Sequence, residues 1–388
     1  FANQSGWSVI DVDSGHEFGL DPLEDVSIMV ESGLVSILPP ALLPAHPSHL
    51  EFPGPVASNA PRTESNLTFH SNQTGLPREF GPANPRAMIL HSTGLYAPPG
   101  EPVTVVVPQA IVDSGVSVQV GVHDDTLWHK SKIWRFPSIV RSYPIAETQF
   151  EVGNAFGGPI FLASPPDAPL GSTWAEFRGA VEAPMYQHGT TSFSEWQSIR
   201  NRSAPWAEIS SDQFIMSVPS SEIRGLDDPE ELMDFWVEAL EMEHELYGFM
   251  PWPRIERAAF DIQISAGWMH SGYPFMAHLV SAQEAVDLEH MESEGSWGMF
   301  HELGHNHQWN PSRLPGTTEA TCNFASVYLM EDLVGRDLGH SALSPQQRHQ
   351  RMESYFQGGA DIDDWSVWTA LDTYLIIKEE WGWAPITQ

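Results

Sequence analysis

The chain has 388 residues, of which 41% are hydrophobic and 18% charged, so it is apolar enough to form a core and too apolar for a disordered acidic tail. Its 51 acidic residues outnumber 18 basic ones, and the formal net charge is −33. Nucleic-acid binders and polybasic membrane adaptors need clustered positive charge, so the composition excludes both. We also expect no membrane-spanning segment, because no uninterrupted run of about 18 apolar residues occurs.

Cys322 is the only cysteine, so the chain has no intrachain disulfide. A small secreted scaffold held by disulfides is thereby excluded, whereas an exported enzyme with a large core is not. We interpret Cys322 as a small buried residue of a helix, in preference to a redox sensor.

The predicted elements change in character along the chain. Residues 1–84 are rich in Pro, Ser and Asn, which allows few regular elements and predicts an N-terminal extension or linker. Residues 85–170 contain short β-prone runs at 103–107, 116–122 and 133–140, separated by Pro, Gly and Asp turns. This spacing predicts a sandwich-like β domain.

Residues 171–388 mix helical and strand patterns. After an Asp-Asp-Pro start, large apolar residues fall on one face of residues 229–245 and predict a helix. Alternation at residues 259–265 then predicts a strand, and two further helical stretches follow. We therefore expect an α+β chain with its β-rich domain first.

The clearest chemistry lies in residues 297–308, WGMFHELGHNHQ. On a helix, His301 and His305 are one turn apart and project from the same face, so both imidazoles can bind one Zn²⁺. Glu302 lies about 100° around the helix from His301 and can reach a water on the metal without being a ligand. The pattern therefore indicates a catalytic metal site, although five residues of this kind also occur by chance on ordinary helices.

A catalytic zinc needs a third protein ligand and an open fourth position. Glu319 offers an acid at the start of the next helical stretch, and the Asn-Pro and Pro-Gly pairs before it allow the chain to turn back. A His301/His305/Glu319 site is predicted. The uncharged residues that flank the motif also favour a metal site over chance.

Three more side chains near the motif have expected roles. Asn323 lies one turn beyond Glu319, where zinc enzymes with a glutamate ligand commonly place an acid that braces a ligand histidine. Because Asn accepts an imidazole N–H but carries no charge, we expect a weaker bracing role. His307 and Gln308 point to other sides of the helix and are expected to pack or bond locally.

These residues resemble one known family. The runs HELGHNHQ and PGTTEATCN, together with STGLYAPPGEPVTVVVP, NRSAPWAEI, VPSSEIRGL and DIQISAGWMHSGYP upstream, resemble the peptidase M60-like (enhancin-type) zinc metallopeptidases. The resemblance extends from about residue 86 to residue 388. It implies a β-rich module followed by a zincin catalytic domain of the gluzincin type over residues 171–388, with one catalytic Zn²⁺.

The resemblance also implies a location and a substrate. It implies a secreted or cell-surface (extracellular or periplasmic) peptidase that acts on mucin-type O-glycosylated proteins. A related eukaryotic branch, the channel-associated factors, has similar surroundings but loses zinc ligands. This sequence keeps His301, Glu302, His305 and Glu319, which favours the active branch.

Residues 267–274 are a candidate wall of the substrate cleft. In zinc peptidases of this build, an edge strand before the zinc helix pairs with the extended substrate, which makes His270, Gly272 and Tyr273 candidate binding residues. A structural turn fixed by two glycines is an equal alternative. Trp297, one turn before His301, and Tyr273 are candidates for the walls of a sugar pocket. Tyr273, His270 and His340 are all possible donors to the oxyanion.

The predicted function is a zinc-dependent endopeptidase in which Glu302 is the general base. A catalytically inactive module that binds glycan or protein is the alternative, and Asn323 keeps it open. An aminopeptidase would need a further acidic group, for which we find no motif. The negative charge favours neutral O-glycans over sialylated ones, unless Arg348 or Arg351 lines the approach.

Overall fold

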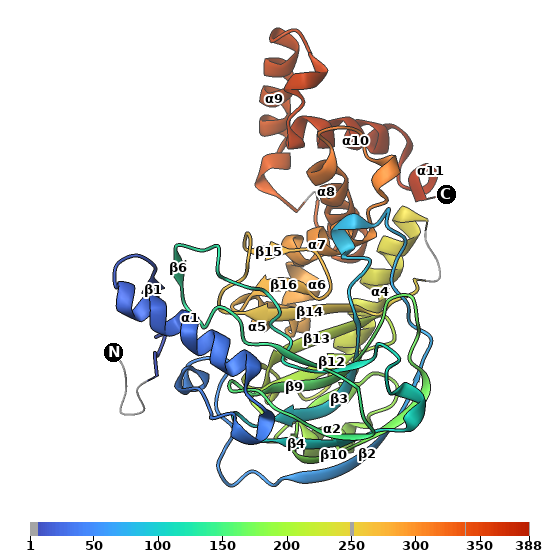
Figure 1. The fold of residues 1–388 in the computed structure, drawn as a ribbon. Coiled ribbons are helices and arrows are strands. Elements are labelled where there is room, and N and C mark those ends of the chain that lie inside the picture. Colours follow the sequence, from blue (N-terminus) through green and yellow to red (C-terminus); the bar gives the residue numbers. More distant parts are fainter. Residues whose placement is uncertain (1–6, 249–251, 338, 388) are drawn as a thin grey trace.

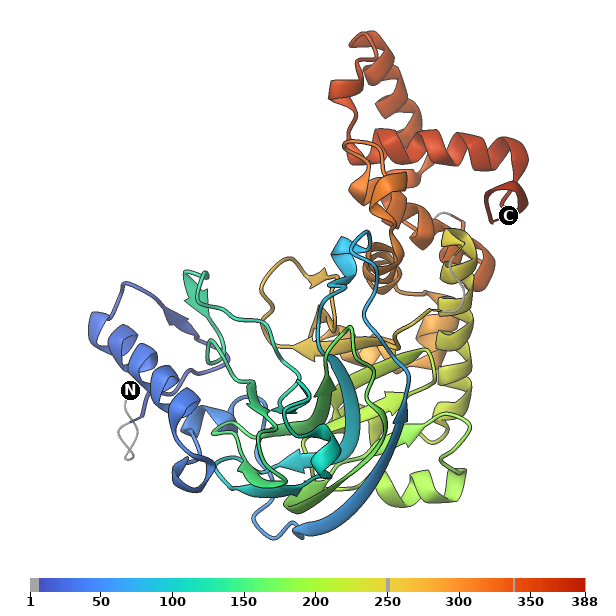
Figure 2. The same cartoon turned by 45° about the vertical axis from the view of Figure 1, so that its right-hand side comes forward.

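The computed structural model describes residues 7–248, 252–337 and 339–387 (Figure 1). The chain is α+β, as predicted, with one eight-stranded and one six-stranded sheet and most of its long helices in the C-terminal half. In both views the sheets form the body of the molecule, and the C-terminal helices project from one end of it (Figures 1 and 2). None of the helices in the described ranges has the length and apolar character of a membrane span.

The N-terminal residues are more regular than their composition predicts. Helix α1 (Pro22–Ile37) begins after Asp21, whose side chain accepts hydrogen bonds from two first-turn amides. Strand β2 (Thr63–Ser71) pairs along its length with β10 (Gly171–Glu182). The expectation of few regular elements before residue 84 is therefore wrong for these two segments. The N-cap residue Asp21 stabilises the start of α1. β2 is stabilised by pairing with β10, which is distant in the sequence.

The eight-stranded sheet folds into a sandwich. Its antiparallel order is β7-β5-β9-β3-β10-β4-β8, with β2 also beside β10. The first part of β10 pairs with β2 and β4, and its end pairs with β3. β10 is therefore part of both layers of the sandwich. Inward residues of both layers share one core. The remaining strands are β3 (Ile89–Ala97), β4 (Val103–Val106), β5 (Ser117–Val120), β7 (Arg141–Pro144), β8 (Gln149–Val152) and β9 (Gly158–Ser164).

The predicted run at residues 133–140 is mostly irregular. Only its first residue belongs to a strand, β6 (Lys132–Ile133), which pairs with β1 (His16–Glu17). Arg135 instead forms a buried ion pair with Asp261, at 2.8 Å, in the other sheet. The prediction of a strand over residues 133–140 is therefore wrong beyond residue 133. This segment forms a contact between the two sheets instead.

The six-stranded sheet has the order β11-β12-β13-β14-β16-β15. β14 (Glu256–Asp261) begins and ends earlier than the predicted strand at 259–265, and all six of its residues are buried because it lies between two parallel neighbours. β15 is at the edge. The other strands are β11 (Met185–Gln187), β12 (Trp206–Ser210), β13 (Phe214–Pro219), β15 (Met269–His270) and β16 (Phe275–His278).

Helices pack against this sheet and carry the metal motif. α4 (Pro229–Tyr247) confirms the predicted helix: Asp228 caps it and Gly248, with φ 72°, ends it. Its apolar face shares a core with the sheet and with α7 (Trp297–His307). The other helices are α2 (Phe193–Ile199), α3 (Ser220–Ile223), α5 (Ser281–Ala285), α6 (Leu288–Ser293), α8 (Thr318–Tyr328), α9 (Pro345–Gln357), α10 (Val367–Trp381) and α11 (Ala384–Thr387).

Candidate metal centre

Helices α7 and α8 bring the predicted ligands to one place. α7 presents His301 and His305 one turn apart, and α8 carries Glu319 in its first turn. The helices approach closely because Gly304 of α7 faces α8: a Cβ at this position would lie 3.1 Å from the carbonyl oxygen of Cys322. The absence of a side chain at residue 304 thus sets how near Glu319 comes to the histidines.

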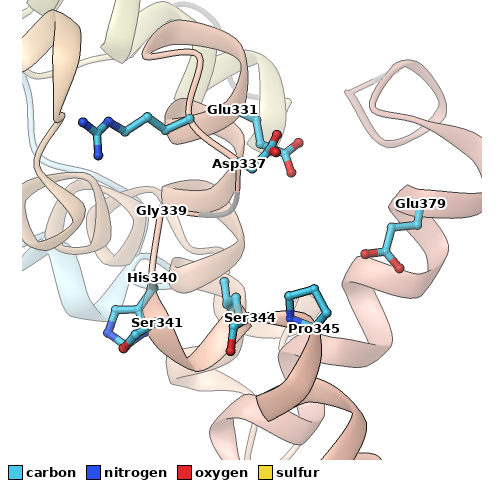
Figure 3. Close-up of a pocket in the computed structure, with 10 residues that line it drawn as sticks. Glu331, Asp337, Gly339, His340, Ser341, Ser344, Pro345 and Glu379 are labelled. Atoms are coloured by element: carbon cyan, nitrogen blue, oxygen red, sulfur yellow. The ribbon is translucent and has the colours of Figure 1, made fainter.

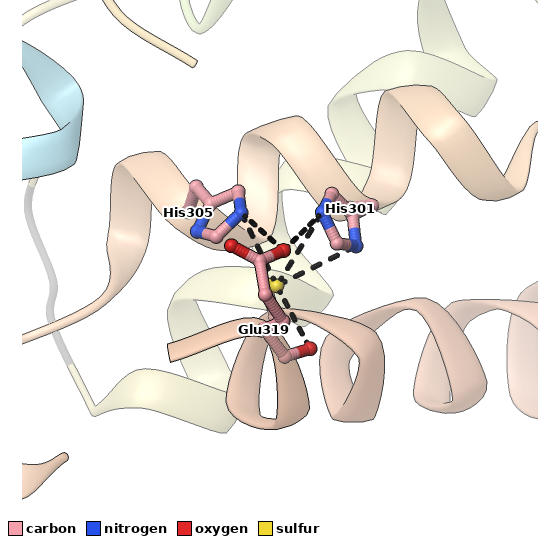
Figure 4. Close-up of side chains that lie close together, drawn as sticks. His301, His305 and Glu319 are labelled. Atoms are coloured by element: carbon pink, nitrogen blue, oxygen red, sulfur yellow. Dashed lines mark hydrogen bonds and ion pairs between the residues drawn. The ribbon is translucent and has the colours of Figure 1, made fainter. Parts of the chain in front are cut away.

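The ligand atoms converge (Figure 4). Oε2 of Glu319 lies 3.2 Å from Nε2 of His301 and 3.3 Å from Nε2 of His305. Hydrogen bonds to His301 and then to His305 hold the pKa of Glu319 well below its usual range, so this carboxylate is anionic. Two imidazole nitrogens and one anionic oxygen at this spacing form a donor set that suits Zn²⁺.

The other nitrogen of each histidine is held by an amide oxygen. Nδ1 of His301 lies 2.7 Å from Oδ1 of Asn323, which places Asn323 where the sequence predicts it. Nδ1 of His305 lies 3.0 Å from Oε1 of Gln308. Both amides fix the tautomer that leaves Nε2 free for a metal. The expectation that Gln308 points to another side of the helix from His305 is wrong, because Gln308 is the C-cap of α7, where the backbone becomes extended, and its side chain reaches His305.

Glu302 is next to this group and is 7% exposed. Burial raises the pKa of Glu302, while electrostatic interactions with His301, His305 and His270 oppose that rise. A buried carboxylate of raised pKa is a stronger base than an exposed one, which is the property that a general base needs.

The edge strand β15 and the loop after it border a polar cavity of about 360 Å³. His270 lies on this border, with its Nε2 2.8 Å from Oδ2 of Asp125. Burial lowers the pKa of His270, but the hydrogen bond to Asp125 raises it above its usual value, and the charge of Glu302 adds a smaller contribution in the same direction. Other polar side chains at this cavity are Asp124, Thr126, His129 and Ser265.

Gly272 is held to the motif helix by its backbone. Its N–H donates to Oδ1 of Asn306, at 3.0 Å, and its carbonyl accepts from Nδ2 of the same side chain, at 2.9 Å. Nδ2 also donates to Oε2 of Glu256 in β14. Asn306 therefore fixes the loop after the edge strand relative to α7. The sequence prediction missed this residue, although it lies directly after His305.

Tyr273 is among the residues that line the cavity beside β15, but little of its side chain is exposed there. Its side chain is 4% exposed, its hydroxyl accepts a hydrogen bond from the amide of Leu90, and the guanidinium of Arg254 lies 4.2 Å from its ring centroid. The hydroxyl is thus used to join the two sheets. Trp297 is half-buried, and its indole N–H donates to Oδ1 of Asn323, which places it beside the ligand His301.

His307 does not bond locally as predicted: its Nδ1 lies 2.6 Å from Oε2 of the buried Glu243 of α4, a helix far away in the sequence. His340 packs against the rings of Trp297 and Trp368. It also borders a second cavity of about 690 Å³, which has acidic residues on its walls (Figure 3).

Arg348 and Arg351 both pair with the buried carboxylate of Asp372. Arg348 also pairs with Glu379. Their charges are therefore neutralised within the α9–α10 pair, so the suggestion that they attract an anionic substrate is not supported.

Comparisons with known proteins give a family and a fold. The profile of the family described as "Peptidase M60, enhancin and enhancin-like" matches residues 179–388, and that of the "N-terminal domain of M60-like peptidases" matches residues 61–173. TRPM8 channel-associated factor 2 of Bos taurus is 42% identical over 315 residues, which cover 80% of this chain and 34% of that protein. The chain thus spans about a third of the length of this curated relative.

Two solved structures share the fold at low sequence identity. The M60 catalytic domain of ZmpC from Clostridium perfringens, in complex with the sialyl T antigen, has a TM-score of 0.53 and 14% identity, covering 69% of this chain and 57% of that one. IMPa from Pseudomonas aeruginosa, in complex with an O-glycopeptide, has a TM-score of 0.55 and 16% identity, covering 85% and 43%.

Proposed function

Because the chain belongs to the peptidase M60, enhancin and enhancin-like family, we propose that it is a zinc-dependent endopeptidase that cleaves O-glycosylated, mucin-like proteins. The observation that carries this proposal is the convergence of Nε2 of His301, Nε2 of His305 and Oε2 of Glu319, beside the buried carboxylate of Glu302. These three ligands would hold one Zn²⁺, which supplies Lewis-acid catalysis and lowers the pKa of water when bound.

Each nearby side chain then has a defined task. Glu302 takes a proton from the attacking water and returns it to the amine of the leaving peptide. Asn323 and Gln308 orient the imidazoles of His301 and His305 through Nδ1. His270 is the candidate donor to the oxyanion, because it is coupled to Glu302 and borders the polar cavity.

The substrate backbone is proposed to add to the sheet edge. β15 is the last strand of the six-stranded sheet, so an extended peptide can pair with its free side. Asn306 fixes the backbone that follows this strand, which would set the position of the scissile bond relative to α7.

The polar cavity beside β15 is the proposed sugar subsite. Asp124, Asp125 and His129 offer acceptors and donors for sugar hydroxyls, and a site built to bond hydroxyls discriminates against a peptide that lacks them. The solved structures of ZmpC and IMPa, which hold the sialyl T antigen and an O-glycopeptide, support this class of substrate. Carboxylates at the cavity and the net charge of −33 favour neutral O-glycans over sialylated ones.

Matched glycopeptides test this proposal. One peptide sequence is prepared bare, with a single GalNAc on Ser or Thr, and with a sialylated glycan, and each is incubated with and without chelator. We expect new peptide termini by mass spectrometry only from glycosylated peptides without chelator, with the neutral glycan cleaved fastest. Equal cleavage of the bare peptide would contradict the sugar dependence and leave the zinc peptidase standing.

A binding module without catalysis is the second candidate. The 42% identity to a TRPM8 channel-associated factor favours it, since that relative is named for an association and not for hydrolysis. In this case the M60 fold would hold a glycan or a protein partner at the same cleft. Glycoprotein binding that survives chelation, with no new termini after long incubation, would support the module.

Two further features remain proposals. We place the protein outside the cytoplasm, secreted or at a cell surface, because its proposed substrates are there, and fractionation of the native source tests this. We also propose that the sandwich and the catalytic domain meet just after β10 (Gly171–Glu182), because this strand belongs to the sandwich although the two family profiles adjoin within it, between residues 173 and 179. Limited proteolysis tests the boundary.

A further inference from the structure

Cys322 lies inside the candidate metal centre. It follows Glu319 by about one turn of α8 and is fully buried. Its Sγ is 3.4 Å from Nε2 of His305 and 3.6 Å from Nε2 of His301. The four ligand atoms of Cys322, Glu319 and the two histidines all lie within 4.8 Å of one another, which makes them one group. The thiol also donates to the carbonyl oxygen of Glu319, at 3.2 Å, so its rotamer directs Sγ toward both histidines.

Four of the six separations within the group match those of a tetrahedral site. Zinc–nitrogen and zinc–oxygen bonds of about 2.05 Å place two such ligands about 3.3 Å apart, and a zinc–sulfur bond of about 2.3 Å places sulfur about 3.6 Å from a nitrogen. The structure has 3.2 and 3.3 Å between Oε2 of Glu319 and the two Nε2 atoms. It has 3.4 and 3.6 Å between Sγ of Cys322 and the same atoms.

The position of the sulfur is fixed by packing. The backbone of Cys322 contacts Gly304, where a Cβ would lie 3.2 Å from the Cα of Cys322, so α8 is held against α7 at this residue. Nδ1 of His301 is also near the sulfur, at 3.4 Å, but it is bonded to Asn323. Nε2 is therefore the nitrogen that remains for a metal shared with the sulfur.

We infer that the thiolate of Cys322 is the fourth protein ligand, so that the resting centre is a His₂–Glu–Cys site. This inference rests on the proposed function, because both need a metal at His301, His305 and Glu319. A bound Zn²⁺ would need the deprotonated thiol, whose proton would go to solvent. Cys322 would then hold the metal together with His301, His305 and Glu319, and hydrolysis would need a further coordination position for water.

Cobalt substitution tests the inference with a readout other than activity. Because Cys322 is the only cysteine, a near-ultraviolet sulfur-to-cobalt charge-transfer band in the Co²⁺ protein has one possible source. We expect this band in the wild type and in Glu302→Gln, which keeps all four ligands, and we expect its loss in Cys322→Ser. Zinc affinity of Cys322→Ser should fall at least about tenfold, since losing even an outer partner of a ligand costs about 10–100-fold.

X-ray absorption at the zinc edge of the wild type provides a second measurement that needs no variant. We expect one sulfur scatterer at about 2.3 Å beside nitrogen and oxygen scatterers. One bound metal per chain with only nitrogen and oxygen scatterers would overturn the cysteine ligand and leave the proposed peptidase intact. A chain that binds no stoichiometric metal would overturn both.

Discussion

Gly304→Ala tests how the spacing of α7 and α8 controls the metal centre. The added Cβ would lie 3.1 Å from Cβ of Ala325 and from the carbonyl oxygen of Cys322. Ordinary contacts begin at 3.4 Å, so α8 must move by a few tenths of an ångström. Metal–ligand distances tolerate only about 0.2 Å, so this movement should misplace Glu319.

The expected cost to folding is small compared with the cost to metal binding. Crowding of a packed interface costs about 1–3 kcal/mol, and replacing Gly by Ala inside a helix returns about 1 kcal/mol. We therefore expect the metal-free Gly304→Ala protein to lose up to about 2 kcal/mol of unfolding free energy. Its zinc affinity should fall about tenfold or more, which is the loss observed when a residue that positions a metal ligand is changed.

Gly298→Ala is the matched control on the same helix. A Cβ at Gly298 would meet the sulfur of Met269 at 2.9 Å, which is the flexible end of a side chain and can move. Both variants gain helix propensity, but only Gly304→Ala disturbs the α7–α8 contact. Competition with a chelating dye measures zinc affinity, and thermal unfolding measures stability. Equal zinc affinities of the two variants would refute the argument.

Three other predictions concern the cleft, the base and the metal. Asn306→Ala should raise KM more than it lowers kcat, with zinc content unchanged, because it frees Gly272 from α7; an unchanged KM would count against edge-strand pairing. His270→Asn should move the acid limb of the pH profile of kcat/KM to higher pH. The positive charge of His270 lowers the pKa of Glu302, whose carboxylate must be unprotonated to act, so removing this charge raises that pKa. A shift of the acid limb to lower pH would contradict this electrostatic interaction. Removing zinc by chelation should lower the Tm and abolish hydrolysis, and readdition at about 1,000 times Kd should restore about 4 kcal/mol of stability; a Tm indifferent to zinc would contradict the site.

The residues of the candidate metal centre could be proposed from the sequence because their geometry is local. His301 and His305 share a helix face by the helical period alone, and a turn followed by an acid suggests Glu319. The structure places these atoms about as far apart as one shared metal requires. The place of Cys322 was not predictable from spacing, because it depends on how closely α8 packs against Gly304.

Contacts between segments that lie far apart in the sequence could not be predicted from it. Tyr273 has the pattern of an exposed cleft residue, but its hydroxyl bonds Leu90 in the other sheet. Arg348 and Arg351 were named as residues that could line the approach of an anionic glycan, but Asp372 of α10 pairs with both. Hydrophobic pattern and residue propensity do not predict such long-range pairings. They do predict the fold class, because it depends on the type and order of the local elements.

Glu302→Ala, compared with the wild type, separates the binding of zinc from the hydrolysis of the peptide. Both proteins are purified without chelator, their zinc content is measured by elemental analysis, and both are incubated with the same GalNAc-bearing peptide. We predict one zinc per chain in both proteins and new peptide termini only with the wild type. Absence of zinc from the wild type, or equal cleavage by Glu302→Ala, would contradict the claim that this chain is a zinc peptidase with Glu302 as its base.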